Sequence, residues 1–110
     1  MINKTDIEFE IGSGNIFADL GLENAEELHR RARIGSHVVK LLKDRNMNQS
    51  DLSILIGIKQ AEVSHLMNGH FERFSTDKLL DFLEHLNYKV DIQISPRQNG
   101  EPYQSVAFAV

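Results

Sequence analysis

Histidine and serine are the residue types in this chain that would most readily serve a metal site or a catalytic site. The five histidines are His29, His37, His65, His70 and His85. They are not spaced in the sequence like the ligands of one metal ion, which must converge on it in a fixed geometry. Ser64 and His65 are neighbours, and neighbouring side chains on a helix point apart, so they do not make a nucleophile–base pair. The chain has no cysteine, which removes disulfides and thiolate chemistry. We therefore expect no enzyme, no metal and no cofactor.

The elements that would position Ser64 and His65 lie in the stretch from Asn48 to Gly69. Asn48 offers a side-chain oxygen that can cap a helix, and Asp51 follows at the capping-box position. Gly57 stands where a left-handed residue commonly ends a helix. The apolar residues recur at helical spacing on both sides of this glycine: Leu52, Leu55 and Ile56, then Val63, Leu66 and Met67. Two short helices joined by a tight turn predict a helix-turn-helix, whose second helix lies in a DNA major groove.

Two further helices are expected to pack around this motif. Asn24 can cap an apolar pattern that predicts one helix running to about Arg45. Within it, Gly35 marks either a kink or the close approach of another helix. Ser75 is placed to cap a second helix over residues 76–86. Together they predict a helical DNA-binding domain over residues 23–87.

Residues 1–22 form an N-terminal arm whose pattern is less regular. Ile7, Phe9 and Ile11 alternate with acidic residues, which is typical of a strand. A short strand of this kind cannot bury both faces alone. Two interpretations stay open: the arm folds onto its own domain, or it docks on a partner protein.

Residues 88–110 change to the period of a strand. Apolar and polar residues alternate from Tyr88 to Ser95, and Asn99-Gly100 is a strong signal for a hairpin turn. The sequence therefore predicts a C-terminal β-strand or hairpin. Because a lone hairpin exposes its edges, we expect it to pair with a second subunit in a dimer or with the N-terminal strand.

The charge of the chain restricts how it can hold DNA. The net charge is −4, and residues 1–33 carry −3 of it, with four Lys/Arg against seven Asp/Glu. Phosphate neutralisation needs Lys and Arg facing the duplex, so DNA must be bound by a local basic face. The sequence has no apolar run that spans a bilayer and no signal-peptide pattern, which favours a cytoplasmic protein.

The chain resembles the helix-turn-helix domain of phage repressors and the xenobiotic-response-element family, which has a lambda-repressor-like fold. The residues that carry this resemblance are MNQSDLSILIGIKQAEVSHLMNG followed by FSTDKLLDFLEHL. Over residues 15–95, the segment NIFADLGL, the Phe-Ser helix entry and the strand after it make it similar to the HigA-type antitoxins of toxin–antitoxin operons. The resemblance implies a mainly α fold, a lambda-repressor-like helix-turn-helix bundle with a C-terminal strand.

The resemblance also implies which residues contact DNA. Gln49 matches a glutamine that contacts a phosphate, and Lys59 stands where phosphate contact is expected. Gln60 matches the first base-reading position, where an amide can bond adenine N6 and N7 with roughly 1–3 kcal/mol of discrimination. Ala61 matches a second reading position and can offer a methyl contact. The side chains further along that are expected to reach a base, a phosphate or the edge of the groove are Ser64, His65, Asn68, His70 and Arg73.

Two positions depart from the family pattern. Lys59 replaces the usual Ser or Thr at the start of the second helix and is a poor helix cap. Glu62 puts an acid in the recognition helix, where it would weaken DNA binding unless it accepts a hydrogen bond from cytosine N4.

The resemblance implies a dimeric repressor of its own operon that binds double-stranded operator DNA. It also implies an antitoxin that neutralises an RNA-cleaving toxin of the HigB/RelE type, with the acidic arm as the candidate toxin contact. Two alternatives stay open. One is a stand-alone regulator of the same family, and the other is a protein-interaction module that keeps the shape without binding DNA.

Overall fold

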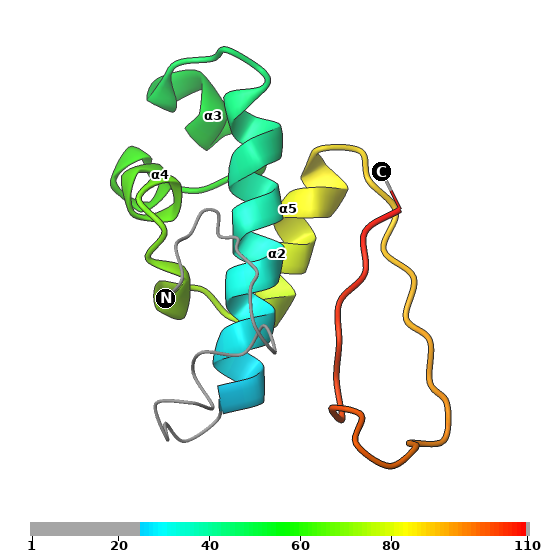
Figure 1. Ribbon diagram of the computed structural model, residues 1–110. Coiled ribbons are helices and arrows are strands. Elements are labelled where there is room, and N and C mark those ends of the chain that lie inside the picture. Colours follow the sequence, from blue (N-terminus) through cyan, green and yellow to red (C-terminus); the bar gives the residue numbers. More distant parts are fainter. Residues whose placement is uncertain (1–24, 110) are drawn as a thin grey trace. The chain divides into compact units, whose positions relative to one another are not determined.

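The computed structural model describes residues 25–109 of the 110-residue chain. Its helices are α2 (Ala25–Lys43), α3 (Gln49–Ile56), α4 (Gln60–Met67), the short 3-10 helix η1 (Phe71–Arg73) and α5 (Thr76–His85) (Figure 1). The mainly helical class predicted from the sequence is confirmed. The predictions made for the arm of residues 1–22 and for a cap at Asn24 fall outside the described residues. Residues 31–96 form one compact unit of the chain.

The core of the unit formed by residues 31–96 takes apolar side chains from every α-helix in it. Its members are at most 7% exposed: Ile34, Val38, Leu42, Leu52, Ile56, Val63, Leu66, Phe74, Leu79, Phe82, Leu83 and Leu86. In α2 the three buried apolar side chains are spaced four residues apart, which puts them on one face of the helix, and the buried Gly35 adjoins them. Four of the six apolar residues predicted to face inward from the helix-turn-helix are fully buried. Leu55 and Met67 are only half-buried.

Side-chain oxygens start two of these helices, as the sequence predicted. The Asp51 backbone N–H donates to Oδ1 of Asn48 at 2.8 Å, which caps α3. The Lys78 backbone N–H donates to Oγ of Ser75 at 3.1 Å, which caps α5. Each cap satisfies a backbone donor that the helix itself leaves without an acceptor.

Left-handed residues end α3, α4 and α5. Their φ angles are 76° at Gly57, 81° at Gly69 and 68° at Asn87. In each case the next residue donates its N–H to a carbonyl five residues earlier: Ile58 to Ser53, His70 to His65 and Tyr88 to Leu83. This is the hydrogen-bond pattern of the Schellman motif, which turns the chain sharply after a helix. Short, sharply ended helices result, and these bring α3, α4 and α5 onto one small core.

Gly35 makes room for an aromatic ring. It is buried in α2, and a Cβ atom built on it would overlap the ring of Phe71 from η1. Phe74, which follows η1, is 5% exposed and packs edge-on against Phe82 with ring centroids 5.7 Å apart. Of the two roles expected for Gly35, the structure supports close approach, and the approaching group belongs to a loop aromatic instead of another α-helix.

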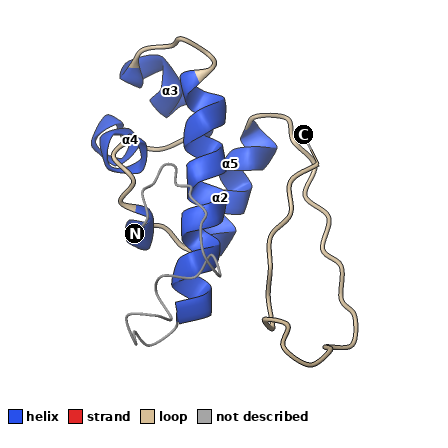
Figure 2. Ribbon diagram, viewed as in Figure 1, coloured by secondary structure: helices blue, strands red, loops and turns tan. Residues whose placement is uncertain are grey.

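The predicted C-terminal hairpin is not formed. No strand occurs between residues 25 and 109, as the absence of strand colour in Figure 2 shows. The turn itself is present, with Gly100 at φ 86° and the Glu101 N–H donating to the Gln98 carbonyl at 3.1 Å. The predicted strands do not form because a two-stranded ribbon without a third strand or a covering helix is at best marginally stable in water.

Candidate nucleic-acid interface

The helix-turn-helix predicted from the sequence is present as α3, a turn of three residues and α4. Helix α3 ends at Gly57, and α4 begins after Lys59. Val63 and Leu66 bury one face of α4 completely in the core. Because α4 is fixed by that face, its opposite face is held outward at a defined angle. We refer to α4 as the recognition helix.

The outward face of the recognition helix carries the residues that were expected to read bases. Gln60 and Ala61 in its first turn are exposed, and Ser64 and His65 one turn later are half-buried. In helix-turn-helix proteins the first turn of this helix is the part that meets base edges. The structure therefore exposes an amide and a methyl group in the first turn of α4. Their roles in reading bases stay predictions.

Gln49 and Lys59 each occupy the start of a helix. Gln49 is the first residue of α3, is exposed, and follows the capping residue Asn48. Lys59 precedes α4 in an extended conformation and makes no side-chain cap hydrogen bond. The expectation that Lys59 is a poor cap is confirmed. Both positions suit phosphate, because helix N-termini present backbone N–H groups and partial positive charge.

Arg73 is not a simple flanking cation. Its Nη2 donates to Oε2 of Glu62 at 3.0 Å, across the loop that joins α4 to η1. The hydrogen bond from Arg73 is the largest cause that lowers the pKa of Glu62, and the charges of Arg73, His65 and Lys59 add to it. The acid that the sequence flagged as unfavourable for DNA is thus compensated by a cation of the same chain.

His65 and His70 form a second pair beside the recognition helix. Their Nδ1 atoms lie 3.1 Å apart and their ring centroids 5.3 Å apart. The backbone ties the same two residues, since the His70 N–H donates to the His65 carbonyl at 3.0 Å. One ring must donate from Nδ1 while the other accepts there. The pairing therefore orients the His65 ring and leaves its Nε2 outside this contact.

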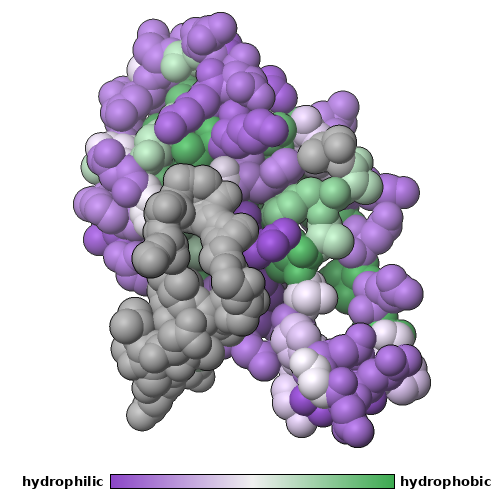
Figure 3. Space-filling model, viewed as in Figure 1, coloured by the Kyte–Doolittle hydropathy of each residue, from purple (hydrophilic) through white to green (hydrophobic). Residues whose placement is uncertain are grey.

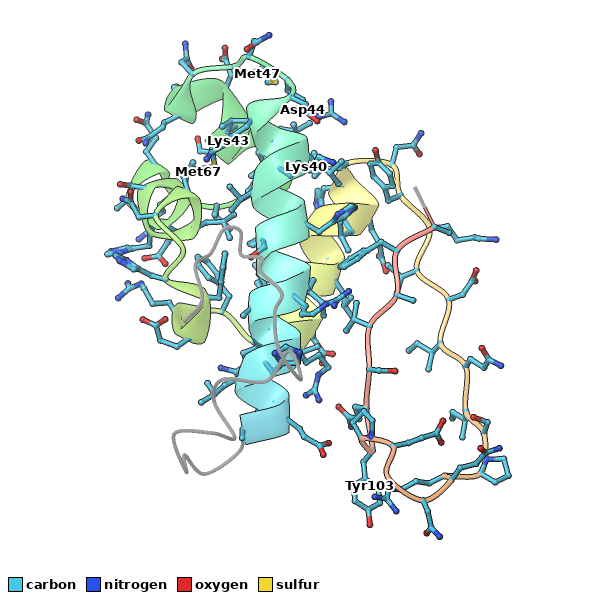
Figure 4. All side chains as sticks on the ribbon, in the orientation of Figure 1. Lys40, Lys43, Asp44, Met47, Met67 and Tyr103 are labelled. Atoms are coloured by element: carbon cyan, nitrogen blue, oxygen red, sulfur yellow. The ribbon has the colours of Figure 1, made fainter. Side chains whose placement is uncertain are left out.

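The end of α4 and the end of α2 supply further polar groups. Asn68 ends α4, is exposed, and donates its backbone N–H to the Ser64 carbonyl at 3.0 Å. Lys40 and Lys43 are exposed in the last turn of α2, and the connector that carries Met47 leads from there to α3 (Figure 4). Figure 3 shows mostly hydrophilic residues over α3 and α4 in that view. Of these groups, Lys40 and Lys43 carry the positive charge that the chain's net charge requires of a DNA-binding face.

Sequence reasoning did not foresee the pairing of Glu62 with Arg73. The two residues are eleven positions apart and meet only because the Gly69 turn folds η1 back beside α4. The sequence offered one signal for it: Glu62 is an acid in the recognition helix, and such an acid is expected to pair with a cation. The prediction that Arg73 contacts DNA is not tested by this geometry.

Neither a metal site nor a membrane span is found in the part of the chain that the structure describes. Within residues 25–109 no three or more His, Cys, Asp or Glu side chains gather as metal ligands would. None of the described helices is both long and apolar enough to cross a membrane.

Comparison with known proteins identifies the domain. The profile of a family described as a helix-turn-helix domain matches residues 16–95. This span covers α2 to α5 and extends beyond them on both sides. No curated protein matches the chain.

Proposed function

Because the chain belongs to the helix-turn-helix domain family, we propose that it is a sequence-specific transcriptional repressor that acts as an antitoxin. The family makes it a DNA-binding regulator; repression, the operator and the toxin are the proposed steps. The observation that carries the proposal is the recognition helix, which Val63 and Leu66 anchor in the core while Gln60 and Ala61 stay exposed.

In this proposal the recognition helix enters the major groove by its first turn. The Gln60 amide reads adenine, and the Ala61 methyl packs against a base edge. Gln49 and Lys59 hold phosphates, because each stands at a helix N-terminus. Base contacts give the sequence preference, and phosphate contacts set the position and most of the affinity.

We propose that two copies bind together. A two-fold dimer places one recognition helix in each of two successive major grooves of a palindromic operator. The segment 88–95 is the proposed contact, because it is extended, alternates apolar and polar residues, and leaves Ile92 80% and Ile94 92% exposed. Pairing with the same segment of a second copy would satisfy backbone groups along it and cover these side chains.

The antitoxin role rests on the segments around the helix-turn-helix. The family match begins at residue 16 and ends at residue 95. It therefore includes all but the first residue of the NIFADLGL segment, together with the residues after α5 that carry the resemblance to HigA-type antitoxins. The acidic residues before residue 34 suit contact with a basic, RNA-cleaving toxin, since opposite charge speeds and orients association.

The DNA-binding part is tested with the purified full-length chain and DNA from upstream of its own gene. We expect a shifted complex that contains two copies per palindrome and that competitor DNA of random sequence does not displace. If no duplex is bound at low salt, the protein-interaction module replaces the repressor as the best account.

The antitoxin part is tested by co-expression with the product of the neighbouring gene. We expect a stable complex between the two proteins and relief of the growth arrest that the neighbour causes alone. If DNA is bound but the neighbouring product neither arrests growth nor forms a complex, the stand-alone regulator is the correct interpretation.

A further inference from the structure

The ion pair between Glu62 and Arg73 sits at the side of the recognition helix. Glu62 belongs to the first turn of α4, and Arg73 is the last residue of η1. Their side chains are 33% and 44% exposed respectively, with Nη2 and Oε2 3.0 Å apart. Both groups are therefore accessible to a duplex that approaches α4.

The position of Glu62 on α4 shows which side of the helix it serves. At about 100° per residue, Glu62 lies about 100° around the helix axis from the exposed Ala61 and about 40° from the buried Leu66. It is therefore turned from the exposed face toward the buried face. Its half-buried state agrees with this placement, whereas Ala61 is exposed. Glu62 is thus on the flank of the helix, where a duplex in the groove presents phosphates more than base edges.

A carboxylate and a phosphate are equivalent acceptors for a guanidinium group. Both take short, charge-assisted hydrogen bonds from arginine in the same geometry. Arg73 can therefore hold Glu62 or a DNA phosphate through Nη2, but not both through that group. While the pair is formed, the Glu62 carboxylate also cancels the positive charge that a phosphate would meet at the other N–H groups of Arg73. If Arg73 moves to a phosphate, the Glu62 carboxylate is left without its nearest cation beside the negatively charged duplex.

We propose that Glu62 is an internal competitor for DNA phosphate at Arg73 and thereby lowers the affinity of the domain for every duplex. Phosphate contacts are made with operator and non-specific DNA alike, so both lose the contribution of Arg73 by the same factor. The base contacts of Gln60 are unaffected. The ion pair consequently weakens DNA binding and its salt dependence and leaves the ratio of operator to non-specific affinity unchanged. This inference rests on the proposed DNA-binding function and assigns a role within it.

The lowered pKa of Glu62 is consistent with this role, because the side chain stays a carboxylate near neutral pH. The other charged groups around it are Lys59 on its own helix, His65 one turn along, and Arg73 from η1. Of these, Arg73 has a direct hydrogen bond to Glu62, and it is the cation whose release would add a phosphate contact.

The test is a salt titration of DNA binding by the full-length chain and by Glu62→Gln. Operator DNA and a random-sequence duplex are each titrated between 50 and 200 mM salt. For the random duplex, we expect Glu62→Gln to bind more tightly at low salt. One added phosphate contact steepens the slope of log affinity against log salt concentration by about 0.9. Between 50 and 200 mM salt, the variant should therefore lose about 3.5-fold more affinity than the natural chain. Operator affinity should rise by the same factor as affinity for the random duplex, so that the ratio of operator to random affinity stays unchanged.

A double-mutant cycle with Arg73→Gln separates competition from simple repulsion. If Glu62 acts through Arg73, Glu62→Gln steepens the slope in the natural chain and has little effect in the Arg73→Gln background. Glu72→Gln is the matched control, because Glu72 is an exposed neighbour whose backbone carbonyl, not its carboxylate, accepts from Arg31. It should leave the slope unchanged, and the unfolding midpoints of all variants should agree.

Two results would overturn the inference. One is an equal effect of Glu62→Gln in both backgrounds with an unchanged slope, which makes Glu62 a repelling charge only. The other is a selective loss of affinity for operators at one base pair, which makes Glu62 a base-reading residue. If the natural chain binds no duplex at all, the proposed function itself is wrong, and this outcome is recognised before any variant is compared.

Discussion

The helix-turn-helix and the C-terminal segment differ in how far sequence periodicity determined their structure. Both regions have strong patterns, one with the period of a helix and one with that of a strand. The stretch 48–69 forms the predicted helices, while residues 88–109 form no strand. The helices place their apolar residues in a core of the same chain, whereas Ile92 and Ile94 stay exposed. A pattern becomes regular structure only where its apolar face has a surface to cover it.

The largest expected effect comes from equal truncations in these two regions. Leu66→Ala removes a fully buried side chain and should lower the free energy of unfolding by about 2–5 kcal/mol. Ile94→Ala, at a position 92% exposed, should change it by less than about 0.5 kcal/mol. Urea unfolding at low protein concentration measures both. Ile94→Ala should instead weaken self-association in sedimentation. Similar unfolding losses for the two variants would remove the contrast between the regions.

Gly35→Ala tests the packing of η1 on α2. The new methyl group would overlap the Phe71 ring, and overpacking of this kind costs about 1–3 kcal/mol. Better helix propensity offsets up to about 1 kcal/mol of that loss. Thermal unfolding should therefore show net destabilisation, and the added change Phe71→Leu should recover part of it. A more stable Gly35→Ala variant would show that the ring moves away freely.

Asn48→Ala tests the local start of α3. Losing the hydrogen bond to the Asp51 N–H should cost about 1 kcal/mol. Asn48→Ser is the matched control, because serine caps helices about as well as asparagine, and it should keep most of the stability. In the C-terminal segment, Asn99→Ala caps no helix and should be nearly neutral. A loss at Asn99 as large as that at Asn48 would mean that the C-terminal turn contributes to folding of the isolated chain.

The smallest expected effect is a pH dependence of stability through His37. Burial, followed by the charge of Lys40, lowers the pKa of His37 below its usual value of 6.5. The unfolded chain therefore binds the proton more readily than the folded chain. The contribution of His37 to stability is present above pH 6.5 and decreases as the pH falls from there through the folded pKa. In His37→Gln, the unfolding midpoint should depend less on pH between pH 7.5 and 5 than it does in the natural chain. An unchanged pH profile would assign the dependence to other groups.

Local chemistry explains which parts of the fold were predictable. The cap at Asn48 and the left-handed end at Gly57 depend on a few consecutive residues, and the sequence identified both. The same is true of the exposed first turn of the recognition helix.

Contacts between distant positions were not predictable in this way. The fit of Phe71 against Gly35 and the ion pair of Glu62 with Arg73 arise from the path of the loop after α4. The residue types alone do not identify which residues will be in contact, because phenylalanine, glycine, glutamate and arginine have many common roles. The C-terminal segment failed as a prediction for a different reason: its pairing surface is not supplied by residues 25–109.

The central claim is that the recognition helix reads base edges through Gln60. The most direct measurement is selection of binding sites from a random duplex library by the natural chain and by Gln60→Ala. We predict that the natural chain selects a palindromic site with an A·T pair at one position of each half. Gln60→Ala should lose preference there alone, by roughly 1–3 kcal/mol, and keep the rest of the site. Identical sites from the two proteins, or no selected site from the natural chain, would contradict the claim.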